Sequence, residues 1–66
     1  MAFITKEVTT QQIYAWMLSY LKENNGANIQ EVAGEALIEF SLDEEDETIS
    51  EIVYDIAVEA KENMYL

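Results

Sequence analysis

Apolar side chains recur at helical spacing in three separate segments of the chain, and this spacing constrains the fold more than any other feature. A repeat of i, i+3, i+4 places apolar residues on one face of a helix, whereas a half-buried strand requires strict alternation. The repeat therefore predicts an all-α protein with helices near residues 9–25, 28–40 and 48–64. The three apolar stripes are Ile13, Trp16, Met17, Tyr20 and Leu21; Ile29, Val32, Ala33, Ala36, Leu37 and Phe40; and Ile49, Ile52, Val53, Ile56, Ala57, Ala60 and Met64.

The first helix has a complete start signal. Thr9 is a suitable N-cap, and Gln12 stands three residues later, at the reciprocal position of a capping box. Val8 and Ile13 occupy the two positions of a hydrophobic staple. We expect the helix to end at Asn24-Asn25-Gly26, because these residues tolerate the left-handed conformation.

Similar signals precede the other two helices. Asn28 is followed by Glu31, and Thr48 is followed by Glu51, each pair at capping-box spacing. Gly34 interrupts the second helix at a cost of about 1 kcal/mol relative to Ala. It marks either a close contact between helices or a position without a packing role.

Three short amphipathic helices with short connections predict a small three-helix bundle. At 66 residues the chain forms one domain. Residues 1–7 are expected to form a flexible tail or a short N-terminal arm. A chain of this length buries only about 60% of the surface that its unfolded form exposes. We therefore expect a homodimer, with Tyr14 and Leu18 of the neutral first helix at the interface.

Cysteine and histidine are both absent. Their absence removes disulfides, thiolate metal sites and the commonest general base. No apolar run approaches the roughly 20 residues of a membrane helix, and the first eight residues lack the apolar stretch of a signal peptide. We expect a cytoplasmic protein that is not an enzyme and needs no cofactor.

The acidic run Asp43-Glu44-Glu45-Asp46-Glu47 raises the question of calcium binding. An EF-hand loop that began at Asp43 would need Gly at its sixth position and Glu at its twelfth. Those positions hold Thr48 and Tyr54. The run therefore lacks the pattern of such a loop, and we expect no specific metal site.

The net charge of −11 is confined to the second half of the chain. Residues 1–30 carry two acidic and two basic side chains, whereas residues 31–66 carry twelve acidic side chains and Lys61 as the one basic side chain. Such a surface repels nucleic acid phosphates and anionic membranes. It attracts basic surfaces and speeds encounter with them.

Acidic residues also recur every four positions, which makes them neighbours about 5–6 Å apart at Cβ on a helix. The second-helix ribbon is Glu31, Glu35 and Glu39, and the third-helix ribbon is Glu51, Asp55 and Glu59. Charges opposite a buried stripe are ordinary on a solvated face. However, like charges at this spacing cost a few tenths of a kcal/mol per pair. Two ribbons joined by the acidic run favour a functional surface.

Apolar residues accompany the ribbons. On a helical wheel, Tyr54, Val58 and Tyr65 lie away from the third stripe and beside its ribbon, and Ile38 falls on the acidic side of the second helix. Such residues suit either a partner-binding surface or a homodimer interface. The predicted partner-binding residues are Glu31, Glu35, Glu39, Asp43, Glu44, Glu45, Asp46, Glu47, Glu51, Tyr54, Asp55, Val58 and Glu59.

Two short segments resemble known motifs, and each departs from its family. Ser41-Leu42-Asp43 is similar to the Asp-Ser-Leu attachment site of acyl carrier proteins, but Phe40 stands where that site has Asp. Residues 18–33 resemble the opening two helices of a winged-helix DNA-binding domain. The third helix would then approach phosphates, yet it carries four carboxylates and only Lys61 after Thr48. Its charge argues against direct DNA binding.

These observations predict a basic protein partner, with no direct binding of nucleic acid or membranes. Carboxylates at this spacing roughly match the distance between phosphates along one DNA strand. The first interpretation is therefore an inhibitor or regulator that presents a DNA-like negative surface to a nucleic-acid-binding protein, as phage-type anti-defence proteins and immunity proteins against nuclease toxins do. The alternative is a structural helical homodimerisation module whose acidity serves solubility. Salt dependence of partner binding separates the two.

Overall fold

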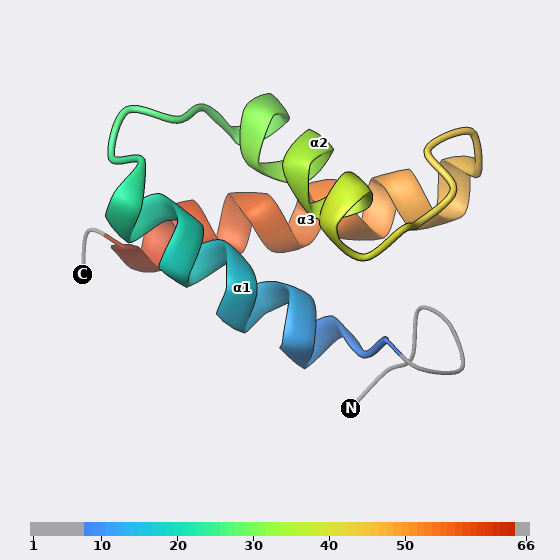
Figure 1. Ribbon diagram of the computed structural model, residues 1–66, viewed down its shortest axis with the longest axis horizontal. Coiled ribbons are helices and arrows are strands. Elements are labelled where there is room, and N and C mark those ends of the chain that lie inside the picture. The colour runs from blue at the N-terminus through green and yellow to red at the C-terminus, as the bar shows by residue number, and fades with distance from the viewer. Residues whose placement is uncertain (1–7, 65–66) are drawn as a thin grey trace.

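A computed structural model describes residues 8–64, in which three helices follow one another along the chain (Figure 1). The helices are α1 (Thr10–Glu23), α2 (Ile29–Glu39) and α3 (Glu47–Met64). The predicted all-α three-helix bundle is confirmed, with each helix within about two residues of its expected bounds. The predicted N-terminal arm and Tyr65 lie outside the described residues. Within them, no helix combines the length and the apolar character needed to cross a membrane.

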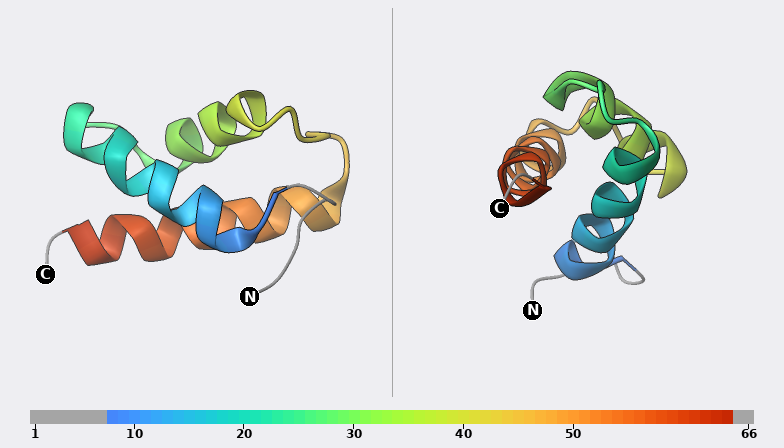
Figure 2. Two further views of the ribbon diagram at one scale, coloured as in Figure 1. Left: turned by 60° about the horizontal axis from the view of Figure 1, so that its bottom comes forward. Right: turned by 90° about the vertical axis from the view of Figure 1, so that its left-hand side faces the viewer.

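The longest helix, α3, packs against both of the others, while α1 and α2 contact each other less extensively. The end-on view in Figure 2 (right) places α3 on one side and α1 and α2 on the other. The connection between α2 and α3 lies at one end of the bundle (Figure 1). α3 is therefore the central packing partner of the other two helices.

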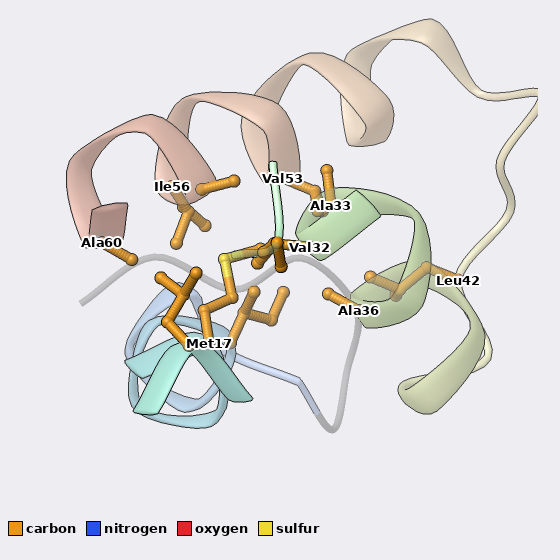
Figure 3. Packing of buried hydrophobic residues seen from close by; sticks show 12 residues of the cluster. Met17, Val32, Ala33, Ala36, Leu42, Val53, Ile56 and Ala60 are labelled. Carbon is orange, nitrogen blue, oxygen red and sulfur yellow. The ribbon is translucent and has the colours of Figure 1, made fainter. Parts of the chain in front are cut away.

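The core lies where the three predicted stripes meet (Figure 3). Ile13, Met17, Val32 and Val53 are its largest fully buried side chains. Around them, α2 and α3 each contribute two buried alanines. The buried apolar residues of the described chain are Ile13, Met17, Leu21, Ala27, Val32, Ala33, Ala36, Leu42, Val53, Ile56, Ala57 and Ala60.

The start of α1 confirms the predicted capping box. The Gln12 amide donates to Thr9 Oγ1 at 3.2 Å, and the Thr9 amide donates to Gln12 Oε1 at 2.7 Å. The helix ends at the predicted place by a different device. Gly26 has no positive φ; instead both the backbone N–H and the Nδ2 of Asn24 donate to the Tyr20 carbonyl, at 2.8 and 3.0 Å.

At α2, Asn28 is the predicted cap, and its side chain accepts from the Glu31 amide at 2.8 Å. At α3, the predicted Thr48 cap is wrong, because the helix begins at Glu47. The Asp46 carboxylate accepts instead from the Thr48 and Ile49 amides at 3.0 and 3.3 Å. A carboxylate at this position also interacts favourably with the positive end of the helix dipole.

The end of α2 is a Schellman motif. The Leu42 amide donates to the Leu37 carbonyl at 2.8 Å, and the Ser41 amide donates to the Ile38 carbonyl at 3.1 Å. Ser41 has a φ of 53°, in the left-handed region that Gly usually occupies. Leu42 is buried and Leu37 packs on the same core, so the motif directs the chain across the end of the bundle toward α3.

Gly34 has no packing role in this fold. A Cβ at this position would meet no atom within 4 Å. Of the two sequence-based interpretations, a close helix contact is therefore wrong.

Candidate protein-binding surface

The third-helix ribbon consists of exposed side chains. Glu51, Asp55 and Glu59 are exposed, and Glu47 extends the same spacing by one step toward the start of α3. Each step of four residues advances about 6 Å along the helix axis. None of these four side chains forms a hydrogen bond or an ion pair within residues 8–64. Glu47 and the third-helix ribbon together thus form a row of four carboxylates about 18 Å long, unpaired within the described part of the chain.

The basic residue nearest to this ribbon in sequence has another role. Lys61 Nζ donates to the Ala27 carbonyl at 2.8 Å, in a partly buried contact between α3 and the α1–α2 connection. The ammonium group satisfies a backbone acceptor of that connection. Within residues 8–64, no ion pair joins this ammonium group to a carboxylate of α3.

Some carboxylates of the acidic run accept hydrogen bonds from the backbone, and the others are unpaired within residues 8–64. Asp46 caps α3, and the Asp43 carboxylate accepts from the Glu45 amide at 3.0 Å, which stabilises a tight turn. Glu44, Glu45 and Glu47 have exposed side chains. Of the five predicted binding residues in this run, Asp43 and Asp46 therefore have a demonstrated structural role.

The second-helix ribbon lies beside aromatic residues. Tyr20 Oη donates to Glu31 Oε2 at 3.2 Å, while Glu35 and Glu39 remain exposed. Tyr20 stacks on Trp16 with ring centroids 5.2 Å apart, and Phe40 meets Trp16 edge-on at 6.1 Å. Partial burial, the hydrogen bond to Glu31 and the charges of Glu31 and Glu35 all raise the pKa of Tyr20. This ribbon is partly engaged with α1.

The two ribbons lie on opposite flanks of α1. The second-helix ribbon adjoins Tyr20, whereas Glu59 of the third-helix ribbon lines a hollow of about 210 Å³ with Thr10 and Tyr14. At about 100° per residue, Tyr14 and Tyr20 stand on either side of the buried stripe of α1. The structure therefore does not unite the predicted residues into one face. The acidic run connects the two ribbons at one end of the bundle (Figure 1).

The apolar residues predicted to accompany the ribbons differ in exposure. Tyr54 is 43% exposed and Val58 is half-buried, both on α3. Ile38 on α2 is 70% exposed. On the helical wheel, Tyr54 lies on the same side of α3 as Lys61, and Lys61 contacts the α1–α2 connection. Glu59 lies on the side of α3 that faces α1. Tyr54 and Glu59 therefore border the outward surface of α3 on opposite sides.

A hollow at the α2–α3 corner was not predicted. It has a volume of about 470 Å³, and its lining combines apolar with acidic residues: Leu37, Ile38, Ser41, Leu42, Asp43, Glu44 and Glu45. The hollow follows the turn of the chain at Ser41. The sequence does not predict this turn, because Gly or Asn usually occupies the left-handed position and Ser does not. The aromatic contact between Trp16 and Phe40 was also not predicted, because it joins residues of different helices.

No group of three or more acidic, His or Cys side chains is placed to hold a metal ion within residues 8–64. The carboxylates of this part of the chain are thus spread over the surface and are not gathered around one point. Comparisons with protein-family models, with curated proteins and with solved structures found no match to this chain.

Proposed function

We propose that this protein binds a basic protein partner, and that it inhibits or regulates a nucleic-acid-binding protein by presenting carboxylates where that partner would hold phosphates. The observation that carries the proposal is the row of exposed, unpaired carboxylates on α3: Glu47, Glu51, Asp55 and Glu59. The partner's Arg and Lys side chains would form charge-assisted hydrogen bonds with them. The protein itself would not bind nucleic acid, because both surfaces are negative.

The geometry favours α3 and the adjoining acidic run over the second-helix ribbon. α3 is the longest of the three helices, and Glu47 both ends the acidic run and begins the row of four carboxylates. The helix is anchored to both neighbours, so its backbone holds the row in place before a partner arrives. Such pre-organisation reduces the entropic cost of binding.

The cost of the arrangement also supports a role for it. Like charges at i,i+4 destabilise a helix by a few tenths of a kcal/mol per pair, and α3 contains three such pairs in succession. The lysine on α3 is engaged with a backbone carbonyl at 2.8 Å. A solvated face would be more stable with lysines placed among these acids, because opposite charges at this spacing attract.

A pull-down from cell extract at low and high salt tests the proposal. The wild-type protein should capture basic proteins at low salt and release them at high salt, because screening weakens exposed ion pairs. The triple variant Glu51→Lys, Asp55→Lys, Glu59→Lys should lose this capture while keeping its helical circular dichroism spectrum, since all three side chains are exposed. Capture of the same proteins by both chains would contradict the proposal, as would capture that salt does not change.

A homodimerisation module is the second candidate. The exposed side chains of Ile38 and Tyr54 favour it, because both are large and apolar. Light scattering after gel filtration at micromolar concentration decides between the two states. A dimer that dissociates when both residues are changed to Ser would support this candidate, and a monomer would exclude it at that concentration. In either function, the proposed location is the cytoplasm.

A further inference from the structure

The hollow at the α2–α3 corner combines an apolar wall with an acidic rim. Leu42 belongs to the core and the partly buried Leu37 packs against it, while Ile38 has 70% of its surface exposed. Asp43, Glu44 and Glu45 line the same hollow. Single exposed apolar residues are normal on protein surfaces. Ile38 is distinguished because it borders a concave space of about 470 Å³ that faces carboxylates.

Internal hydrogen bonds fix the shape of this corner. The Ser41 and Leu42 amides complete the Schellman motif. Across the turn, the Asp46 amide donates to the Asp43 carbonyl at 3.2 Å, and Ser50 Oγ donates to the Glu44 carbonyl at 2.9 Å. The backbone of the rim is therefore tied to both α2 and α3. A partner would meet a formed hollow and would not have to order a loop.

The side chains of the rim are available for a charged partner. Glu44 and Glu45 form no side-chain hydrogen bond or ion pair within the described residues. Asp43 uses Oδ1 for the Glu45 amide, and no contact engages its second carboxylate oxygen in the described part of the chain. Charge complementarity thus selects a basic occupant. A second copy of this chain is disfavoured, because it would bring a net charge of −11 to an acidic rim.

We propose that this hollow is a docking site for a basic segment of the protein partner, in which an aliphatic side chain packs against Ile38 and Leu42 while flanking Arg or Lys residues pair with Asp43, Glu44 and Glu45. The inference rests on the proposed function and adds to it an anchor whose contribution does not depend on charge. An apolar anchor surrounded by polar contacts is the common organisation of a protein interface. It gives the acidic surface selectivity among basic proteins.

Two synthetic peptides of equal charge test the docking site. One has the sequence Arg-Arg-Leu-Arg-Leu-Arg, and the other has Ser in place of both Leu residues. We expect the Leu peptide to bind about tenfold more tightly at the same salt concentration, through partial burial of apolar surface. Amide chemical shifts in residues 37–45 should change on its addition. Equal affinities for the two peptides, or shift changes confined to other residues, would overturn the inference.

Ile38→Ser should abolish the preference for the Leu peptide and leave the affinity for the Ser peptide unchanged. Tyr54→Ser is the matched control and should retain the preference. Tyr54 is the second exposed large apolar side chain of residues 8–64, and it lies outside the hollow. The double variant Glu44→Gln, Glu45→Gln should weaken both peptides alike. Retention of the preference in Ile38→Ser would refute the site, and so would its loss in Tyr54→Ser. The circular dichroism spectrum of each variant checks its fold.

The failure of this inference is separable from failure of the proposed function. If Ile38→Ser leaves capture from extract unchanged while Glu51→Lys, Asp55→Lys, Glu59→Lys abolishes it, the docking site is refuted and the proposed function stands. If the peptides show the expected preference but capture from extract is insensitive to salt, the hollow stands and the proposed function is refuted.

Discussion

The second-helix and third-helix ribbons share one sequence pattern and have different surroundings. Both place three carboxylates at i, i+4, i+8 on an exposed helix face. On α2, Glu31 accepts a hydrogen bond from Tyr20 beside an aromatic cluster. On α3, all three carboxylates are free of such contacts within residues 8–64. Spacing alone therefore does not show whether a charged row is available to a partner.

The acidic run repeats this contrast over a few residues. Asp43 and Asp46 have short side chains that accept from backbone amides two or three residues ahead, so they shape the corner. Glu44 and Glu45 extend into solvent. Two carboxylates of the run thus stabilise the backbone, and two others remain available to a partner. The difference follows from side-chain length and position relative to the start of α3.

Removing the support beneath the third-helix ribbon should have the largest effect. Ile56 is 9% exposed and packs in the core below that ribbon, so Ile56→Ala should cost about 2–5 kcal/mol of unfolding free energy. That is enough to abolish folding in a domain of this size. Urea denaturation followed by circular dichroism measures the loss. Ile38→Ala, at an exposed site, should stay within about 0.5 kcal/mol. Equal losses in the two variants would show that α3 is not the buried support.

Substitutions within the acidic run should separate its structural from its unpaired members. Asp46→Ala removes the cap of α3 and should cost about 1 kcal/mol, whereas Glu45→Ala should change stability by less than about 0.5 kcal/mol. Both variants lose one negative charge, so the comparison isolates the hydrogen bonds. Thermal unfolding of the pair at one salt concentration is sufficient. Similar melting temperatures would contradict the assignment of Asp46 as the cap.

A stabilising change on α2 tests whether its outer face is free. Gly34 has no atom near the position of its missing Cβ. Gly34→Ala should therefore raise the unfolding free energy by about 0.5–1 kcal/mol, because Ala favours the helix and restricts the unfolded chain. Denaturant titration measures the gain. A loss of stability would mean that something packs on this face, as a dimer partner would.

The smallest expected effect concerns the contact between Tyr20 and Glu31. Its surroundings raise the pKa of the Tyr20 phenol, so the fold favours the protonated form. This contribution is present below the ordinary tyrosine pKa of about 10 and is lost as pH rises through the raised value. Tyr20→Phe should therefore lose less stability than the wild type above about pH 10. If the melting temperatures of the wild type and of Tyr20→Phe fall equally as the pH rises above about 10, the contribution of Tyr20 ionisation to stability is contradicted.

Much of the fold follows from local signals that the sequence carries. The three stripes, the capping box at Thr9 and the Asn28 cap require only residues close together in the chain. At α3, Asp46 and Thr48 are both competent caps two residues apart, and local preference did not separate them. Ser41 adopts a positive φ that favours Gly or Asn, so the corner and its hollow were missed.

The arrangement of the candidate surface was less predictable. Each ribbon could be found from i,i+4 spacing, but the direction in which it faces depends on how α1 and α2 pack against α3. The contacts of Tyr20 with Glu31 and of Lys61 with the Ala27 carbonyl join different elements. They decide which charges are engaged, and no spacing rule within one helix reveals them.

The most direct test of the account exchanges charge on one ribbon at a time. The variant Glu51→Lys, Asp55→Lys, Glu59→Lys is compared with Glu31→Lys, Glu35→Lys, Glu39→Lys in pull-downs across a range of salt, and circular dichroism confirms that both are helical. The net charge changes by the same amount in each. We predict that the third-helix variant loses the salt-sensitive basic partners, while the second-helix variant captures the wild-type set. Equal loss from both would mean that net charge alone attracts the partners, and would contradict a binding surface on α3.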